Sequence, residues 1–147
     1  MPTTTPSKDE AQIRECLDQW TRALHAKDLT AMTALYGSDT IAFDLMPPSQ
    51  VDASHYRKNL ERWFASLPGG PIEYEIHDLR IVTSGDVAFS HNLSRVKGTR
   101  ANGEKADYWV RVTVGFQKRS GQWLVIHDHV SMPFDMETGK AVRELRR

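Results

Sequence analysis

The chain has almost no cysteine: Cys16 is the only one among its 147 residues, so no disulfide can form within the chain. Such sparing use of cysteine fits a reducing compartment. No apolar run approaches the roughly 18 residues that a membrane-spanning helix needs, and the first ten residues are too polar for a secretory signal peptide. We therefore expect a soluble, cytoplasmic protein with no membrane partner.

The chain also lacks an excess of charge of either sign, because 19 basic residues balance 19 acidic ones. Without a basic stripe, a nucleic-acid partner has little electrostatic support. Three motifs are missing as well: a glycine-rich phosphate loop, G-x-S-x-G and C-x-x-C. These absences argue against the chemistries that those motifs serve, and we expect a protein that works without a cofactor.

What the chain does have is large amphipathic side chains, namely four Trp, four Tyr and five Phe. They suit a core or the wall of a cavity. A chain of this length forms one domain in most cases. We expect a disordered N-terminal arm over residues 1–8, a single domain over residues 9–135, and a polar C-terminal tail over residues 136–147.

Three helices are predicted in the first half of the chain. Ser7 and Glu10 have capping-box spacing, and an apolar stripe follows at helical intervals as far as about Ala26: Ile13, Leu17, Trp20 and Leu24. Thr30 can cap a short second helix that carries Tyr36 and ends at Gly37. Asp52 can cap a third helix, whose apolar side is formed by Tyr56, Leu60, Trp63, Phe64 and Leu67.

Strands dominate the rest of the chain. A short strand-like run covers residues 40–45, and four longer runs separated by turn residues follow at about residues 72–82, 86–97, 105–118 and 122–131. Helices followed by a meander predict an α+β fold. We expect a cone: a strongly curved, mostly antiparallel sheet packed on a long N-terminal helix and two shorter helices, with a cavity between them.

Asp128 is the most informative residue of the last strand. Side chains of a strand alternate between its two faces, so Leu124, Ile126 and Val130 share a predicted core face with Asp128. An unpaired buried carboxylate costs several kcal/mol. Asp128 therefore needs a partner, a proton, a ligand or water, and we predict it as a catalytic residue.

Two further residues are predicted to act with Asp128. Alternation places His91 on an apolar face with Val87, Phe89 and Leu93, while Asp44 lies in a run too short to decide its facing. A carboxyl group in an apolar cavity has a raised pKa and can act as an acid or a base near neutral pH, and a histidine can relay the proton. The alternative is a structural His91–Asp128 pair that closes a polar gap in the core.

His127 and His129 form an H-x-H pattern on the opposite strand face. Two such histidines can bind a metal if a third ligand exists, but that face offers no obvious third ligand, so we predict no metal. With Trp109 and Arg111 they can instead form a sheet-to-sheet dimer interface. One undetected bulge would swap the faces, and Arg111, His127 and His129 would then contact the ligand, with Arg111 as an anion hook.

The cavity wall has its own candidates. Trp20, Tyr36, Tyr56 and Trp63 form an aromatic stripe that serves either as core or as a ligand-binding wall. We predict Trp20, Tyr56 and Trp63 as ligand-binding residues. Cys16 is interpreted as core filler.

Three stretches of the chain resemble the NTF2-like superfamily, in its SnoaL-like, ketosteroid-isomerase-like branch. They are Lys27–Met32 with Ile41–Asp44, Ala88–Leu93 with Gly98–Gly103, and Trp109–Val114 with Gly121–Phe134. They look most like a bacterial subgroup of SnoaL-like proteins, and the last also resembles the calcium/calmodulin-dependent kinase association domain, whose role is assembly. The resemblance implies a fold that hosts isomerases, dehydratases, cyclases and binding modules.

The resemblance also carries over individual positions. Asp44 matches the general-base aspartate of the isomerase, Trp20 stands where the isomerase has an oxyanion-hole tyrosine, and Val112 falls on its protonated aspartate. Asp128 is placed toward the cavity. We expect a cofactor-independent acid/base enzyme acting on a hydrophobic carbonyl compound, or else a non-catalytic ligand-binding or assembly module. A homodimer through the outer sheet face fits both.

Overall fold

The computed structural model describes residues 5–146. Its helices are α1 (Lys8–His25), α2 (Leu29–Thr33) and α3 (Ala53–Ser66). Its strands are β1 (Tyr36–Phe43), β2 (Val51–Asp52), β3 (Glu73–Ser84), β4 (Val87–Thr99), β5 (Lys105–Arg119) and β6 (Gln122–Ser131). The four long strands agree closely with the predicted runs.

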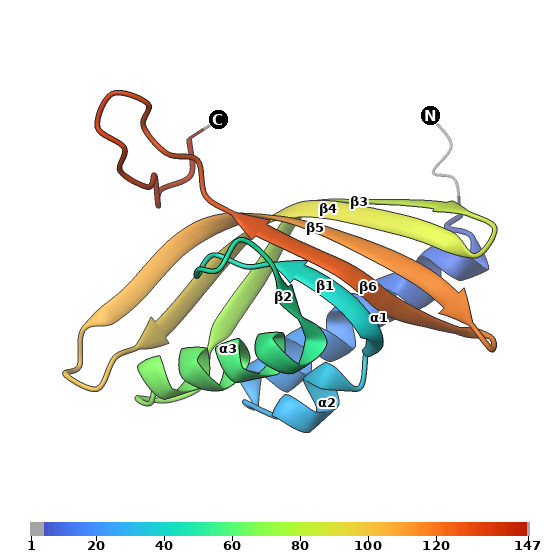
Figure 1. Ribbon diagram of the computed structural model, residues 1–147, viewed down its shortest axis with the longest axis horizontal. Coiled ribbons are helices and arrows are strands. Elements are labelled where there is room, and N and C mark those ends of the chain that lie inside the picture. Colours follow the sequence, from blue (N-terminus) through green and yellow to red (C-terminus); the bar gives the residue numbers. More distant parts are fainter. Residues whose placement is uncertain (1–4, 147) are drawn as a thin grey trace.

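The strands form one curved sheet in the order β2-β1-β6-β5-β4-β3. Only β1 and β6 run parallel, and the other neighbours are antiparallel. All three helices lie on the same side of the sheet, and no helix of the described residues 5–146 covers the other face (Figure 1). The predicted α+β cone, with a mostly antiparallel sheet on one long and two shorter helices, is confirmed.

Helix α1 begins where the capping box predicts. Ser7 is its N-cap and accepts a hydrogen bond from the backbone N–H of Glu10 at 3.1 Å. Ile13 and Leu24 of the predicted stripe are fully buried. Burial of one such side chain contributes about 1.5–3 kcal/mol, so this stripe holds α1 against the sheet.

Helix α2 differs from its prediction at both ends. Asp28, and not Thr30, is the N-cap, and the helix ends at Thr33 instead of running to Gly37. Tyr36 therefore opens strand β1. The physical reason is pairing: Tyr36 lies opposite Val125 of β6, and the backbone of Leu35 accepts a hydrogen bond from Val125, so sheet contacts override a weak local helix signal.

Bulges in β3 and β6 decide which side chains of these two strands face the helices. The first lies in β3, where the register shifts between His77 and Arg80, and Asp78 is in the left-handed region at φ 57°. The second lies in β6, where Gly115 pairs with His127 but Phe116 pairs with Val125, which leaves Ile126 as the extra residue. An extra residue reverses the facing of everything on one side of it.

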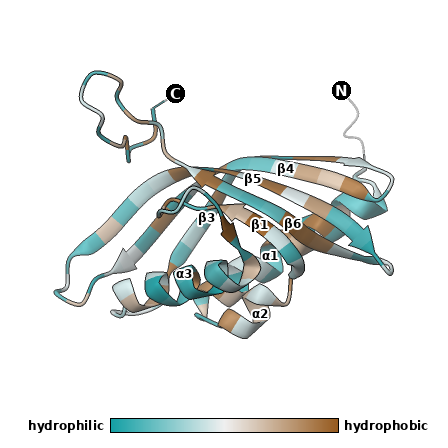
Figure 2. Cartoon of the chain, in the orientation of Figure 1, coloured by the Kyte–Doolittle hydropathy of each residue, from teal (hydrophilic) through white to brown (hydrophobic). Residues whose placement is uncertain are grey.

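The β6 bulge corrects half of the predicted core face. Trp123 and Val125 are buried together with Asp128, while Leu124 and Ile126 are only partly buried. Figure 2 shows the alternation of hydrophobic and hydrophilic positions along the strands.

The chain ends are partly described. Of the predicted N-terminal arm, residues 1–4 lie outside the described residues, and Lys8 already belongs to α1. Beyond β6 the chain turns back on itself, with a bridge between Phe134 and Ala141. The Trp109 backbone N–H then donates to the Arg143 carbonyl at 2.8 Å, which ties residues 136–146 to β5. No helix within residues 5–146 is long and apolar enough to span a membrane.

Candidate functional site

A cavity of about 310 Å³ lies between the helix-covered face of the sheet and helices α1 and α3. Ligand pockets in proteins begin at about this size. Its wall is mostly aromatic and aliphatic, and the aromatic members include Trp20, Tyr36, Tyr56, Trp63, Tyr74 and Tyr108. All three predicted ligand-binding residues of the helices, Trp20, Tyr56 and Trp63, therefore lie in one cavity wall.

Asp128 lies in this wall, and its side chain is 5% exposed. The Tyr36 hydroxyl donates to Asp128 Oδ2 at 2.9 Å, and the Tyr56 hydroxyl donates to the same oxygen at 3.0 Å. The other oxygen, Oδ1, is buried and has no hydrogen-bond partner in the described part of the chain. Oδ2 thus accepts two hydrogen bonds, and Oδ1 accepts none from the described residues.

Burial sets the protonation behaviour of this cluster. Desolvation raises the pKa of Asp128 above its usual value, the two tyrosine hydrogen bonds offset part of that rise, and the nearby charge of Asp44 adds to it. Desolvation, followed by the Asp128 charge, also raises the pKa of both Tyr36 and Tyr56 well above the usual value. Both phenols therefore remain hydrogen-bond donors.

The geometry determines where a proton on Asp128 must sit. Oδ2 already accepts two hydrogen bonds, so it has no room for a proton of its own. A protonated Asp128 therefore carries its O–H on Oδ1. In that form the group is an acid with its donor on the unpaired side.

A second carboxyl group, Asp44, lines the same cavity just beyond the end of β1 and is half-buried. Its Oδ2 accepts a hydrogen bond from the Asn59 amide at 2.9 Å, and its Oδ1 accepts one from the Leu45 backbone N–H at 2.8 Å. Two donors hold the carboxylate in one orientation without covering all of its lone pairs. Asp44 is thus a positioned hydrogen-bond acceptor beside the buried acid.

The comparisons with known proteins agree with this architecture. The family model described as SnoaL-like domain matches residues 13–135. The chain belongs to the SnoaL-like domain family. The comparison with curated proteins found no match.

Solved structures place this SnoaL-like chain among NTF2-like proteins. An NTF2-like protein of unknown function from Pseudomonas putida is 33% identical, covers 98% of this chain over 100% of its own length, and has a TM-score of 0.86. A dehydratase candidate of the NTF2-like family from Streptomyces avermitilis is 15% identical, with 86% and 97% of the two chains covered and a TM-score of 0.75.

The association domain of CaMKII from C. elegans is also similar in structure. It is 15% identical, covers 84% of this chain over 95% of its own length, and has a TM-score of 0.65. At such identities these two likenesses concern the fold alone.

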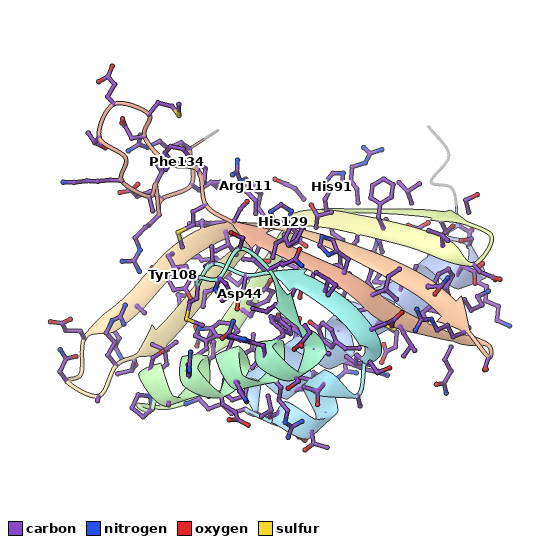
Figure 3. All side chains as sticks on the ribbon, in the orientation of Figure 1. Asp44, His91, Tyr108, Arg111, His129 and Phe134 are labelled. Atoms are coloured by element: carbon purple, nitrogen blue, oxygen red, sulfur yellow. The ribbon has the colours of Figure 1, made fainter. Side chains whose placement is uncertain are left out.

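Four predicted site residues lie away from the cavity of this SnoaL-like domain. His91, Arg111, His127 and His129 are on the sheet face opposite the helices, as Figure 3 shows for His91 and Arg111. The prediction that His91 faces the core is wrong. It pairs with Thr113, and the residues of β4 that face the cavity side are the small or polar Ala88, Ser90, Asn92 and Ser94.

The other three residues have partners on that outer face. Arg111 Nε donates to Ser131 Oγ at 3.0 Å, and His127 Nδ1 donates to the Ile41 carbonyl at 2.6 Å. The Phe43 ring makes edge contacts with both histidines, at centroid distances of 4.7 Å to His127 and 5.1 Å to His129. The alternative in which Arg111, His127 and His129 face the cavity is therefore wrong, and they lie on the outer face.

The sequence reasoning missed two residues of the site in this SnoaL-like chain. Tyr36 was placed on the second helix and in an aromatic stripe, yet it is one of the two donors to Asp128. Asn59 was overlooked, although it is a polar residue on the apolar side of α3, three residues after Tyr56 and four before Trp63. That spacing puts it on the buried face, and it is the signal that could have found Asn59.

Metal binding has no support from side-chain grouping. Within residues 5–146, no three His, Cys, Asp or Glu side chains come together in a way that could hold an ion.

Proposed function

We propose that the cavity binds a hydrophobic carbonyl compound and that Asp44 and Asp128 transfer protons to and from it without a cofactor. The observation that carries the proposal is the buried Asp128 carboxyl group in an aromatic cavity, with one oxygen saturated by two phenols and the other unpaired. Burial of this kind raises the pKa of Asp128, as an acid near neutral pH requires.

The two carboxyl groups suit different roles. Asp44 is half-buried and accepts two hydrogen bonds, so it is the base that removes a proton from the carbon next to the carbonyl. Asp128, with its O–H on Oδ1, donates a hydrogen bond to the carbonyl oxygen as negative charge develops there. The product of this step is an enolate held by Asp128, with the abstracted proton on Asp44.

Several reactions share this step. Return of the proton from Asp44 to another carbon gives isomerisation. Attack of the enolate on a second carbonyl, with the proton passing to the new alkoxide, gives cyclisation. Loss of a β-hydroxyl that takes the proton from Asp44 and leaves as water gives dehydration. Trp20 lies in the same wall as a further N–H donor. His91 is too far removed, on the other face of the sheet, to assist.

Proton exchange tests the proposal without knowledge of the natural substrate. Benzylacetone, a hydrophobic ketone, is incubated with the protein in D₂O, and loss of the protons next to its carbonyl is followed by NMR. We expect exchange faster than with an equal mass of serum albumin, and a rate that follows the ionisation of one carboxyl group. No acceleration, or a flat profile between about pH 4 and pH 8, would count against acid/base catalysis.

A second candidate function, assembly, has its own observation. The face of the sheet opposite the helices exposes Val82 and Phe89 on one side and Ile41 on the other. The strand register joins them in one row through Gly115 and His127, because Val82 pairs with Phe89, Phe89 with Gly115, Gly115 with His127, and His127 with Ile41. Phe89 is 45% exposed and Val82 46% exposed. Contiguous exposed apolar surface of this kind is typical of an interface.

We propose a homodimer in which two copies pack outer face to outer face. A two-fold axis through the sheet would set each apolar row against its own copy, with His91, Arg111, His127 and His129 around it. This arrangement leaves the cavity on the far side of each sheet, so dimerisation and ligand binding are compatible.

Phe89→Glu is expected to convert this dimer into a monomer, because it would bury two carboxylates at the interface without partners. Light scattering coupled to gel filtration measures the mass directly. Lys58→Glu, at an exposed position of α3, is the matched control and is expected to remain dimeric. A monomeric wild-type protein at micromolar concentration would rule out this interface.

A further inference from the structure

Unpaired buried polar atoms are concentrated around the cavity. Within residues 5–146, six buried side-chain nitrogen or oxygen atoms have no hydrogen-bond partner. Four of them belong to residues of the cavity wall, namely Trp20 Nε1, Asn59 Oδ1, Trp63 Nε1 and Asp128 Oδ1. A buried polar group without a hydrogen-bond partner is unfavourable, so a ligand that pairs with these atoms gains free energy on binding.

The first pair of such atoms lies on α3. Asn59 and Trp63 are four residues apart, which puts their side chains on the same face of the helix. The orientation of the Asn59 amide follows from its neighbour: the Asp44 carboxylate can only accept, so the amide nitrogen faces Asp44 and Oδ1 is the free end. The pair therefore offers one acceptor, Asn59 Oδ1, and one donor, Trp63 N–H.

The second pair, Trp20 Nε1 and Asp128 Oδ1, lies around Tyr36. Its hydroxyl donates to Asp128, and the Trp20 indole lowers the pKa of the same phenol, which places the indole N–H beside it without a hydrogen bond between them. Trp20 is held in place by an edge contact with Tyr74, at a centroid distance of 5.0 Å. When Asp128 carries its proton on Oδ1, the pair offers two donors, the Trp20 N–H and the Asp128 O–H. A carbonyl oxygen can accept a hydrogen bond from both.

The two pairs lie at different points along the cavity. Asp128 is level with Val114 of β5. The Trp63 indole N–H instead faces the Tyr108 hydroxyl. Burial raises the pKa of that phenol and the indole lowers it, but the two form no hydrogen bond. Tyr56, which donates to Asp128, and Trp63 are seven residues apart on α3, roughly 10 Å at the usual rise per residue of a helix, and Val110 and Val112 belong to the cavity wall in between. A ligand that reaches both pairs must be elongated and apolar in its middle.

We propose that Asn59 and Trp63 form a second polar subsite that binds a hydroxyl group, so that the ligand is an elongated, uncharged hydroxy ketone. A hydroxyl group is the small neutral group that both donates, here to Asn59 Oδ1, and accepts, here from Trp63 N–H. The assignment of the carbonyl end of this ligand depends on the proposed function of Asp128. The hydroxyl end rests only on the α3 pair.

Three ketones that share the 4-phenylbutan-2-one skeleton test the second subsite by titration calorimetry. Raspberry ketone carries a phenolic hydroxyl at the end remote from its carbonyl, benzylacetone lacks that hydroxyl, and anisylacetone has a methoxy group that accepts but cannot donate. We expect raspberry ketone to bind about tenfold more tightly than benzylacetone, which corresponds to about 1.4 kcal/mol. Anisylacetone is expected to show no such advantage, because Asn59 Oδ1 then remains unpaired.

Tryptophan variants assign the preference to Trp63. Trp63→Phe keeps the ring and removes the N–H, and it is expected to reduce the ratio of the two dissociation constants from about ten to near one. Trp20→Phe is expected to weaken the binding of both ketones and to leave the ratio of their dissociation constants unchanged. Trp109→Phe, a matched change in a residue outside the cavity wall, is expected to leave the ratio at its wild-type value.

The outcomes separate this subsite from the proposed catalysis. Equal affinities for raspberry ketone and benzylacetone, or an unchanged ratio in Trp63→Phe, would overturn the subsite even if benzylacetone exchanges its protons. The subsite would also be overturned if none of the ketones bound with a dissociation constant below about 1 mM. Lack of catalysed exchange together with a clear hydroxyl preference would refute the catalytic proposal and leave a binding protein for hydroxy ketones.

Discussion

Asp44→Asn is expected to slow the deuterium exchange of benzylacetone about 100- to 10,000-fold, the usual contribution of a general base. The amide retains much of the shape of the carboxylate but cannot take up a proton. Because Asp44 is only half-buried, the melting temperature is expected to change by a few degrees at most. NMR exchange rates and a thermal melt of the same preparation measure both quantities.

The matched control for Asp44→Asn is Asp18→Asn. Asp18 lies on the exposed side of α1, and this variant is expected to exchange at the wild-type rate. Asp128→Asn provides the contrast, because it removes the acid but leaves the base. If Asp128→Asn abolished exchange while Asp44→Asn retained it, the two roles would have to be reversed, with Asp128 as the base.

Asp128→Ala is expected to lower the free energy of unfolding by about 3–5 kcal/mol, since it strands the buried hydroxyls of Tyr36 and Tyr56. This corresponds to a fall of about 10 °C in melting temperature for a chain of this size. The alanine variant therefore cannot separate catalysis from stability, and Asp128→Asn is the better probe because its carbonyl still accepts both phenols. Denaturant titration of the variants measures the difference.

A compensating variant distinguishes lost hydrogen bonds from lost packing. Tyr36→Phe, Tyr56→Phe and Asp128→Leu together replace the whole cluster by apolar groups, and most of the stability lost in Asp128→Ala is expected to return. An alanine variant as stable as the wild type would show that the cluster contributes nothing to folding. Failure of the triple variant to recover would instead point to packing around residue 128.

The pH dependence of stability has a definite sign for Asp128. Its pKa in the folded protein lies above the usual 3.8 because burial disfavours the charge, so over that window the folded state binds more protons than the unfolded state. Stability from this group is complete at low pH and is lost as the pH rises through the folded pKa. The stability of Asp128→Asn relative to wild type is therefore expected to increase as the pH rises through that window.

Surface carboxyl groups act in the opposite direction. Hydrogen bonds from Lys118, Arg119 and Arg95 lower the pKa values of Asp9, Asp39 and Asp107, respectively. Their stabilisation is present above the usual pKa and is lost in acid. Since these groups are the same in wild type and variant, the difference between the two proteins isolates Asp128.

The predictions that held were those in which one local pattern was strong. The capping box at Ser7, the caps and stripe of α3 and the four long strands all appear where the sequence places them. The inward facing of Asp128 was also predictable, because alternation holds over the short distance from the bulge to Val130. Hydropathy alone failed on β4, since Phe89 and Val87 are apolar and yet lie on the open face.

The strand faces could have been cross-checked between neighbours. In an antiparallel pair, residues directly opposite each other point the same way. Asn92 lies opposite the buried Val112, and His91 opposite the exposed Thr113. The facing of β5 is the better determined of the two. Because His91 pairs with Thr113, it would have been assigned to the outer face of the sheet. The bulge at Ile126 had no comparable signal in the sequence.

The sequence by itself determined the α+β class, the order of the long elements and the presence of an acid on a core face, because periodicity and capping act over a few residues. Only the tertiary structure decided that Tyr36, Tyr56 and Asp128 meet, and that Asn59 and Trp63 leave unpaired atoms at the same cavity. Those contacts join residues from β1, α3 and β6, and they depend on strand register. A shift of one residue in a strand exchanges its two faces. Such a shift hardly alters the local sequence pattern, so the pattern does not reveal it.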